Sequence, residues 1–272
     1  MSQLKTASIA NSNSRCSSCA LHQWKLCGAF ANQNGAGHKA LHSAHIHMLH
    51  IDAGDVIYSQ GDATQFVYSL VSGWVCLHQD TPDGRRHIGK FLLPGALFGL
   101  EPKGIAAGQG ATSLTAATVC ALPRARFEEM RQHDTAFNER FLWMLERESH
   151  MAVEGLTVMC QGSAMERVSY ILWDLAIRLC ESDVVPANVP LAVPLTQRII
   201  AEATGLTAIH VNRIIRRLRL EHLVELNDGA MLIRNPKRFS QLALFNEDSR
   251  QLWQAEWRSV SGSPRGNPSR VA

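Results

Sequence analysis

Short apolar runs separated by glycine, proline and aspartate occupy the stretch that follows a polar N-terminal segment. Runs of this length with turn residues between them are typical of antiparallel strands. The predicted strands are residues 47–51, 56–58, 66–71, 74–78, 87–93 and 112–122. This spacing predicts an antiparallel roll, barrel or sandwich.

The hydrophobic period changes from about Arg124 onward to that of helices. The pattern predicts a helix of roughly 25 residues that ends near Gly162 and has an apolar stripe along one side. Such a stripe must pack against another apolar surface. A second copy of the same helix in a parallel coiled coil is the favoured partner, and the roll is the alternative. The predicted dimer contacts on this stripe, which also contains Ser149, are Leu142, Leu145, Ala152, Leu156 and Met159.

The chain beyond this helix predicts a second globular unit. Residues 164–181 have the pattern of an amphipathic helix, and residues 183–194, with three prolines, that of a loop. The composition of the last residues is typical of a disordered tail. The predicted parts are a cysteine-containing segment (1–45), a roll (46–125), a dimerisation helix (126–162), a C-terminal domain (163–245) and the tail (246–272).

Residues 195–233 have the pattern of a winged helix-turn-helix. Thr196 is placed to cap a first helix, and Gly205 supplies the turn because glycine adopts a left-handed backbone at no steric cost. Thr207 then caps a second helix, Ala208 to Leu220, whose apolar residues are Val211, Ile214, Ile215 and Leu218. Glu225 to Ile233, with an Asp228-Gly229 turn, predicts the hairpin of a wing.

Charge favours DNA as the ligand of this second helix. The net charge of the chain is only +3, yet Arg213, Arg216, Arg217 and Arg219 follow one another without an acidic residue. Arginine suits guanine edges and phosphates, and asparagine suits adenine, so Arg213 and Asn212 are the first candidates for base contacts. A solvated helix face is the alternative. The predicted DNA-contacting residues are Thr207, Ile209, His210, Asn212, Arg213, Arg216 and Arg217.

Composition narrows the class of protein. With 272 residues and 46% hydrophobic residues, the chain has enough apolar material for a sizeable core. It contains no run of about 18 apolar residues, so we expect no transmembrane helix and no membrane partner. Met1 to Ser14 lacks the apolar segment of a signal peptide, so a cytoplasmic location is expected. No dinucleotide fingerprint or acid–base constellation is evident, and an enzyme is not expected.

Several segments together resemble the bacterial CRP/FNR transcription regulators, over about residues 45–245. The resemblance implies an α+β fold with a cupin-like or cyclic-nucleotide-binding-like antiparallel β-roll, a long dimerisation helix and a winged helix-turn-helix. The matching segments are Ala53–Asp62, Tyr68–Val75, Gly89–Glu101 and Leu206–Leu218. Cyclic AMP is not expected as a ligand, because the arginine that pairs with its phosphate in the family is absent beside Thr112-Ser113.

The resemblance implies a metal-binding role for four of the seven cysteines. Cys16, Cys19 and Cys27 alone are compatible with an iron–sulfur cluster, zinc or inert thiols. The oxygen-sensing branch of the family holds a [4Fe–4S] cluster with three such cysteines and one at the end of a roll strand, which implies Cys120 as the fourth ligand. Zinc and a thiol switch are the alternatives. Cys76, Cys160 and Cys180 are interpreted as structural, and the histidine run from His38 to His50 as a linker, with haem binding as its alternative.

The implied function is that of an oxygen-responsive regulator that binds a palindrome similar to TTGAT-N4-ATCAA as a dimer while its cluster is intact. Contacts with RNA polymerase are expected through roll loops such as Ser72-Gly73 and Asp80 to Gly84, for activation or repression. Ile209 departs from the family, which commonly has a base-reading glutamate there. An isoleucine cannot accept a hydrogen bond from cytosine, and a thymine methyl is its available contact. A regulator gated by another small ligand, haem or zinc is the alternative.

Overall fold

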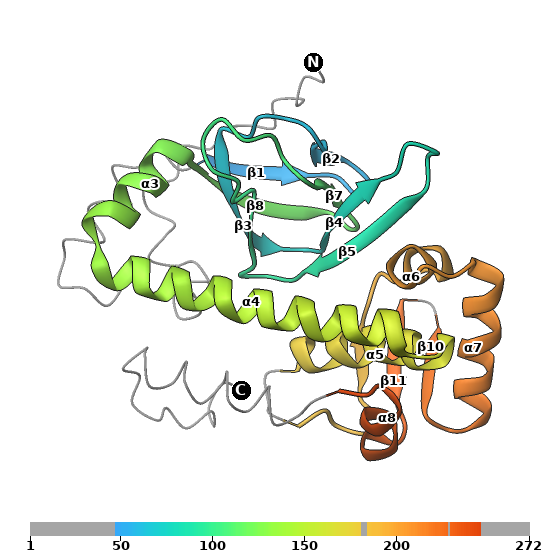
Figure 1. Cartoon of the computed structure of the whole chain (residues 1–272). Helices are drawn as coiled ribbons and strands as arrows, with labels where there is room; N and C mark the ends of the chain where they lie inside the picture. The colour runs from blue at the N-terminus through green and yellow to red at the C-terminus, as the bar shows by residue number, and fades with distance from the viewer. Residues whose placement is uncertain (1–46, 181–183, 228, 246–272) are drawn as a thin grey trace.

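The computed structural model describes residues 47–180, 184–227 and 229–245 (Figure 1). A β-roll comes first, two helices follow it, and a C-terminal unit of helices and a small sheet completes the described chain. The predicted α+β fold is therefore confirmed. None of the described helices combines the length and the apolar character needed to cross a membrane.

The roll consists of two four-stranded antiparallel sheets that enclose a core. The first sheet has the order β1 (His47–Ile51), β8 (Ala117–Pro123), β3 (Phe66–Ser72) and β6 (Leu97–Phe98). The second has the order β2 (Val56–Tyr58), β7 (Gly110–Ser113), β4 (Val75–Asp80) and β5 (Arg86–Leu92). The single strand predicted over residues 112–122 is wrong: β7 and β8 lie in different sheets. The two-residue strand β6 was not predicted.

Aromatic rings fill the interior of the roll. The ring centroids of Tyr58 and Tyr68 are 5.7 Å apart, and those of Tyr68 and Phe98 are 5.2 Å apart, both in stacked orientation. All three residues are buried, as is Leu70 beside them. Such stacked pairs stabilise a core beyond the area that they bury.

Two helices follow the roll, where one long helix was the prediction. These are α3 (Arg124–His133) and α4 (Thr135–Gln161). Asp134 lies between them in extended conformation. Its carboxylate accepts a hydrogen bond from the backbone N–H of Phe137 and so caps the N-terminus of α4. Arg124 ties α3 to the roll by donating to backbone oxygens of Thr64 and Gly99. The N-terminus of α3 is therefore attached to the roll.

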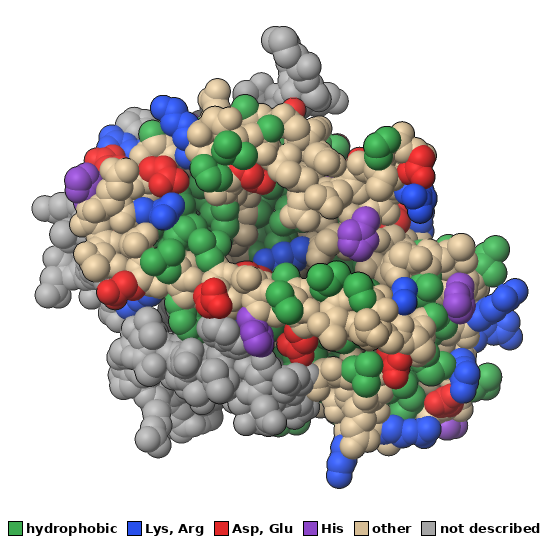
Figure 2. Space-filling view, viewed as in Figure 1, with side chains coloured by type: hydrophobic (Ala, Val, Ile, Leu, Met, Phe, Trp, Pro, Cys, Tyr) green, Lys and Arg blue, Asp and Glu red, His purple; other side chains and the backbone are tan. Residues whose placement is uncertain are grey.

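Helix α4 is apolar on two sides. Near its N-terminus, Phe137 and Phe141 pack against Phe127 of α3. The predicted stripe lies elsewhere on the helix: Leu142 is 50% exposed and Leu156 62%. Figure 2 shows hydrophobic side chains along α4 on the face toward the viewer. This stripe has no cover within the described part of the chain.

The C-terminal unit contains four helices and a three-stranded sheet among the described residues. The helices are α5 (Ala164–Leu179), α6 (Gln197–Thr204), α7 (Ala208–Leu220) and α8 (Pro236–Leu242). The sheet has the order β10 (Val224–Asn227), β11 (Ala230–Ile233) and β9 (Pro190–Ala192). The prediction of a loop over residues 183–194 is wrong for β9. Its proline is tolerated because β9 is an edge strand.

The roll and the C-terminal unit share a buried core. Trp74, Ile88 and Phe91 of the roll belong to one apolar cluster with Leu172 and Ile200 of the C-terminal unit. Polar contacts border this core: Nδ1 of His87 on β5 lies 3.1 Å from the backbone oxygen of Glu202 on α6. Figure 1 shows β5 next to α6. This contact fixes the direction in which α7 faces relative to the roll.

Candidate nucleic-acid interface

Helix α7 and the turn before it have the local structure that the sequence predicted. Gly205 ends α6 in the left-handed region, with φ of 68°. The hydroxyl oxygens of Thr196 and Thr207 accept hydrogen bonds from the backbone N–H groups of Ile199 and His210, and so cap α6 and α7. The apolar face of α7, which consists of Val211, Ile214, Ile215 and Leu218, is buried.

The opposite face of α7 is open to solvent. The structure brings the seven residues predicted to contact DNA together on one exposed surface: Thr207, Ile209, His210, Asn212, Arg213, Arg216 and Arg217. Figure 2 shows basic side chains along the edge of the molecule that the C-terminal unit forms. Contact of each residue with DNA stays a prediction.

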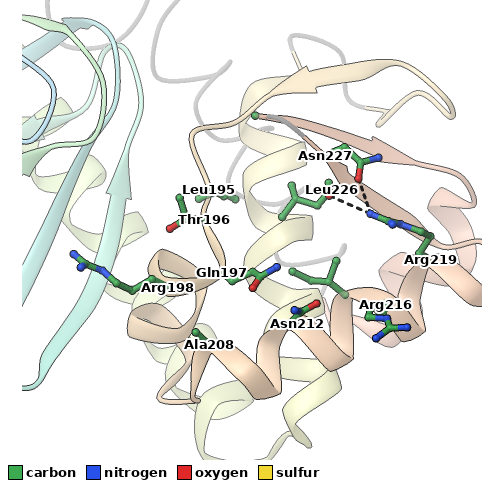
Figure 3. A pocket seen from close by; sticks show the side chains of 12 residues that line it. Leu195, Thr196, Gln197, Arg198, Ala208, Asn212, Arg216, Arg219, Leu226 and Asn227 are labelled. Carbon is green, nitrogen blue, oxygen red and sulfur yellow. Dashed lines mark hydrogen bonds between the residues drawn. The ribbon is translucent and has the colours of Figure 1, made fainter.

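A groove of about 750 Å³ lies between α6, α7 and the hairpin of β10 and β11 (Figure 3). Asn212 and Arg216 reach it from α7, and Asn227 from the end of β10. Gln197 and Arg198 at the start of α6 also line it, and these two were absent from the sequence prediction. Their positions were not evident from the sequence because they join the surface only when α6 packs across α7.

The four arginines of α7 have different surroundings. Nε of Arg217 donates to Oε1 of Glu221 at 2.9 Å, and this i,i+4 pair partly compensates its charge. Nη2 of Arg219 donates to Oδ1 of Asn227 at 2.6 Å, which braces α7 against the wing. Among the described residues, Arg213 and Arg216 form no salt bridge. These two cations are therefore the most available to an anionic ligand.

The predicted metal ligands lie only partly within the described structure. Cys16, Cys19 and Cys27 lie outside the described residues. Cys120 is half-buried in the middle of β8, between the buried residues Val119 and Ala121. Because side chains alternate along a strand, Cys120 lies on the outer face of this sheet.

The remaining described cysteines differ from one another. Cys76 is buried, and its burial raises the pKa of the thiol to about 11, as expected for an inert core cysteine. Cys180 is half-buried. Cys160 is exposed on α4, so its interpretation as a buried structural cysteine is wrong.

The roll residues Thr112 and Ser113, beside which a cyclic phosphate would lack an arginine, have partners within the protein. The hydroxyl of Thr112 lies 2.9 Å from Nε2 of His78, and the hydroxyl of Ser113 donates to the backbone oxygen of Thr115 at 2.6 Å. Thr112, Ser113 and His78 are all buried.

Comparison with known proteins connects these two units. Residues 48–134 match the family model of the cyclic nucleotide-binding domain, and residues 166–242 match that of the Crp-like helix-turn-helix domain. The transcriptional activator protein FnrL of Cereibacter sphaeroides is 30% identical over 176 residues, which is 64% of this chain and 71% of that protein. The chain belongs to the CRP/FNR family of transcription regulators.

Other relatives of this CRP/FNR-family regulator extend the match. The transcriptional activatory protein AadR of Rhodopseudomonas palustris is 29% identical over 225 residues, which cover 83% of this chain and 91% of that protein. The solved structure of FixK2 from Bradyrhizobium japonicum has a TM-score of 0.66 and 26% identity, and covers 72% of this chain and 96% of that one. The regulator is thus a DNA-binding protein related to FixK and FNR, and dimers are typical of its family.

Proposed function

We propose that this regulator binds palindromic DNA as a homodimer and that a [4Fe–4S] cluster, held by Cys16, Cys19, Cys27 and Cys120, makes its binding responsive to oxygen. The observation that carries the cluster proposal is the position of Cys120. Met48, near the start of β1, is the register partner of Cys120 on β8. The segment with the other three cysteines therefore joins the described structure beside the fourth.

The reach of the chain supports this ligand set. Nineteen residues lie between Cys27 and His47, and an extended chain spans at most about 3.6 Å per residue. The segment is therefore long enough to return to the outer face of β8. Thiolate sulfurs at this short spacing suit an iron–sulfur cluster, and such a cluster supplies an oxygen-labile crosslink when it is bound.

The connection from Cys120 to the dimer helix supports a regulatory role. Strand β8 ends at Pro123, and α3 begins with Arg124, which is anchored to roll carbonyls. A restraint on Cys120 therefore acts close to the point where α3 leaves the roll and leads into α4. We propose that it favours the arrangement in which the Leu142, Leu145, Ala152, Leu156 and Met159 stripes of two copies pack together, and that loss of the restraint shifts this equilibrium.

The DNA part of the proposal rests on the exposed face of α7. A dimer places two such helices about one DNA turn apart, which requires a palindrome, and TTGAT-N4-ATCAA is the sequence that the family resemblance favours. Thr207, His210, Asn212 and Arg213 near the helix N-terminus are proposed to meet base edges, and Arg216 and Arg217 phosphates. The roll loops at Ser72-Gly73 and at Asp80 to Gly84, the second of which is exposed throughout, are the proposed contacts for RNA polymerase.

Anaerobic purification of the full chain tests the cluster. We expect about four iron atoms per chain and a broad absorption near 400 nm that air bleaches. Cys120→Ala should lose the band and oxygen-responsive DNA binding, whereas Cys160→Ala, the matched exposed-cysteine control, should keep both. A colourless protein with stoichiometric zinc, or a Cys120→Ala variant that retains the full band, would refute the proposed ligand set.

A further inference from the structure

Ile209 is an exposed apolar residue near the N-terminus of α7, on an outer face that is polar from His210 to Arg219. It is the second residue of this helix, and it is 70% exposed. The buried face of the helix consists of other residues, so Ile209 contributes little to the core. Single apolar side chains on surfaces are common, but Ile209 lies on the helix face that is proposed to contact DNA.

Helix geometry places Ile209 at the centre of the outer face. At about 100° per residue, Ile209 points about 170° away from the centre of the buried face. Arg213 and Arg216 lie within about 40° of the same line, one and two turns further along. Leu220, which is 79% exposed, lies on this line at the other end of the helix. A groove that receives the arginines therefore also receives Ile209.

The chemistry of an isoleucine limits what it can recognise in that groove. It neither donates nor accepts hydrogen bonds, and its β-branched side chain has little rotational freedom in a helix. The apolar group that DNA presents in the major groove is the 5-methyl group of thymine, or of methylated cytosine. A fixed apolar side chain near the helix N-terminus, where base edges are reached, is suited to that methyl group.

We propose that Ile209 is a specificity-determining residue that packs against the 5-methyl group of a pyrimidine in each operator half-site. The inference rests on the proposed binding of DNA by α7. It adds to the hydrogen-bonding side chains a contact that distinguishes thymine from cytosine by one methyl group, and it makes binding sensitive to methylation of cytosine at the same position.

Replacement of single thymines by deoxyuridine tests this contact because it removes only the methyl group. An operator is first selected from a random duplex library with the full-length protein, and each thymine of one half-site is then replaced in turn. At one position the affinity of the unmodified protein should fall about fourfold, as expected for one buried methyl group. At that position, 5-methylcytosine should bind more tightly than cytosine.

Two variants assign the effect to its residue. Ile209→Ala should bind the thymine and deoxyuridine duplexes equally, whereas Leu220→Ala, an exposed residue on the same line, should keep the fourfold difference. A difference that persists in Ile209→Ala, or specific binding in which no thymine methyl matters, would overturn this inference and leave the proposed function intact. A protein that selects no sequence at all would overturn both.

Discussion

The salt dependence of DNA binding should separate Arg216 from Arg217, although the two are adjacent in sequence. Arg216 lines the groove between α7 and the wing and forms no salt bridge among the described residues. Arg217 is held by Glu221, with Nε and Oε1 2.9 Å apart. Substitution to glutamine removes either charge and keeps a polar side chain of moderate length. We expect Arg216→Gln to reduce the number of counterions released on DNA binding more than Arg217→Gln does.

The size of this effect follows from counterion release. Each phosphate contact contributes about 0.9 to the slope of log K against log salt concentration. A dimer presents the residue twice, so Arg216→Gln should lower the steepness by about 1.8. Between about 0.1 and 0.3 M salt, the affinity advantage of the unmodified protein should therefore shrink about sevenfold. Arg217→Gln should show less than about half of this change in slope, because Glu221 already compensates its charge.

Fluorescence anisotropy with a labelled duplex, repeated over a series of salt concentrations, measures both slopes. Circular dichroism of the two variants checks that the helices are intact. Equal loss of slope in Arg216→Gln and Arg217→Gln would show that the ion pair with Glu221 opens at no cost on DNA. An unchanged slope in Arg216→Gln would show that Arg216 does not meet a phosphate.

Three further predictions concern stability and assembly. Gly73 and Gly54 both have positive φ, but only at Gly73 would an added Cβ lie 2.4 Å from a backbone oxygen. In thermal denaturation, Gly54→Ala should cost about 1–2 kcal/mol and Gly73→Ala at least about 3 kcal/mol; equal costs would contradict this packing. Partial burial raises the pKa of Glu148, but its ion pair with Lys90 of β5 and the nearby Arg147 and Arg178 together outweigh this effect and hold the pKa below the usual 4.5. The stabilisation that ionised Glu148 provides is complete above the pKa of an unfolded glutamate and is lost as the pH falls through the lower pKa of the folded state. In urea titrations, the Glu148→Gln protein should therefore lose less stability on acidification than the unmodified protein. An equal loss in both proteins would exclude a contribution from this ion pair. Leu156→Glu should convert dimers to monomers in analytical ultracentrifugation, whereas Thr157→Glu on the same helix should not; a dimeric Leu156→Glu protein would refute the proposed interface.

Local features of the sequence predicted the candidate site well. Gly205 and the capping threonines specify the turn between α6 and α7 through their own backbone chemistry. The apolar period of α7 determines which face is buried, and its exposed face follows from that. Both features depend on neighbours within a few residues, which a single sequence displays directly.

Features that depend on distant contacts were missed or mistaken. The sequence does not indicate that residues 112–122 divide between two sheets, because the stretch contains no glycine or proline and only pairing with β4 and β3 separates its halves. It does not show that β9 completes the small sheet, since a proline in the run opposes a strand unless an edge is available. The exposure of Cys160 depends on how α4 lies against α5, which its local sequence does not specify.

The sequence by itself determined the order of the parts, the caps and turns, and the polar face of α7, because each depends on local propensity and period. The i,i+4 pair of Arg217 with Glu221 is local to α7. Only the tertiary structure decided that Arg219 engages Asn227, because that hydrogen bond forms when the wing packs beside α7. It also decided that β5 packs on α6, because that contact forms only when a buried core joins residues more than a hundred positions apart.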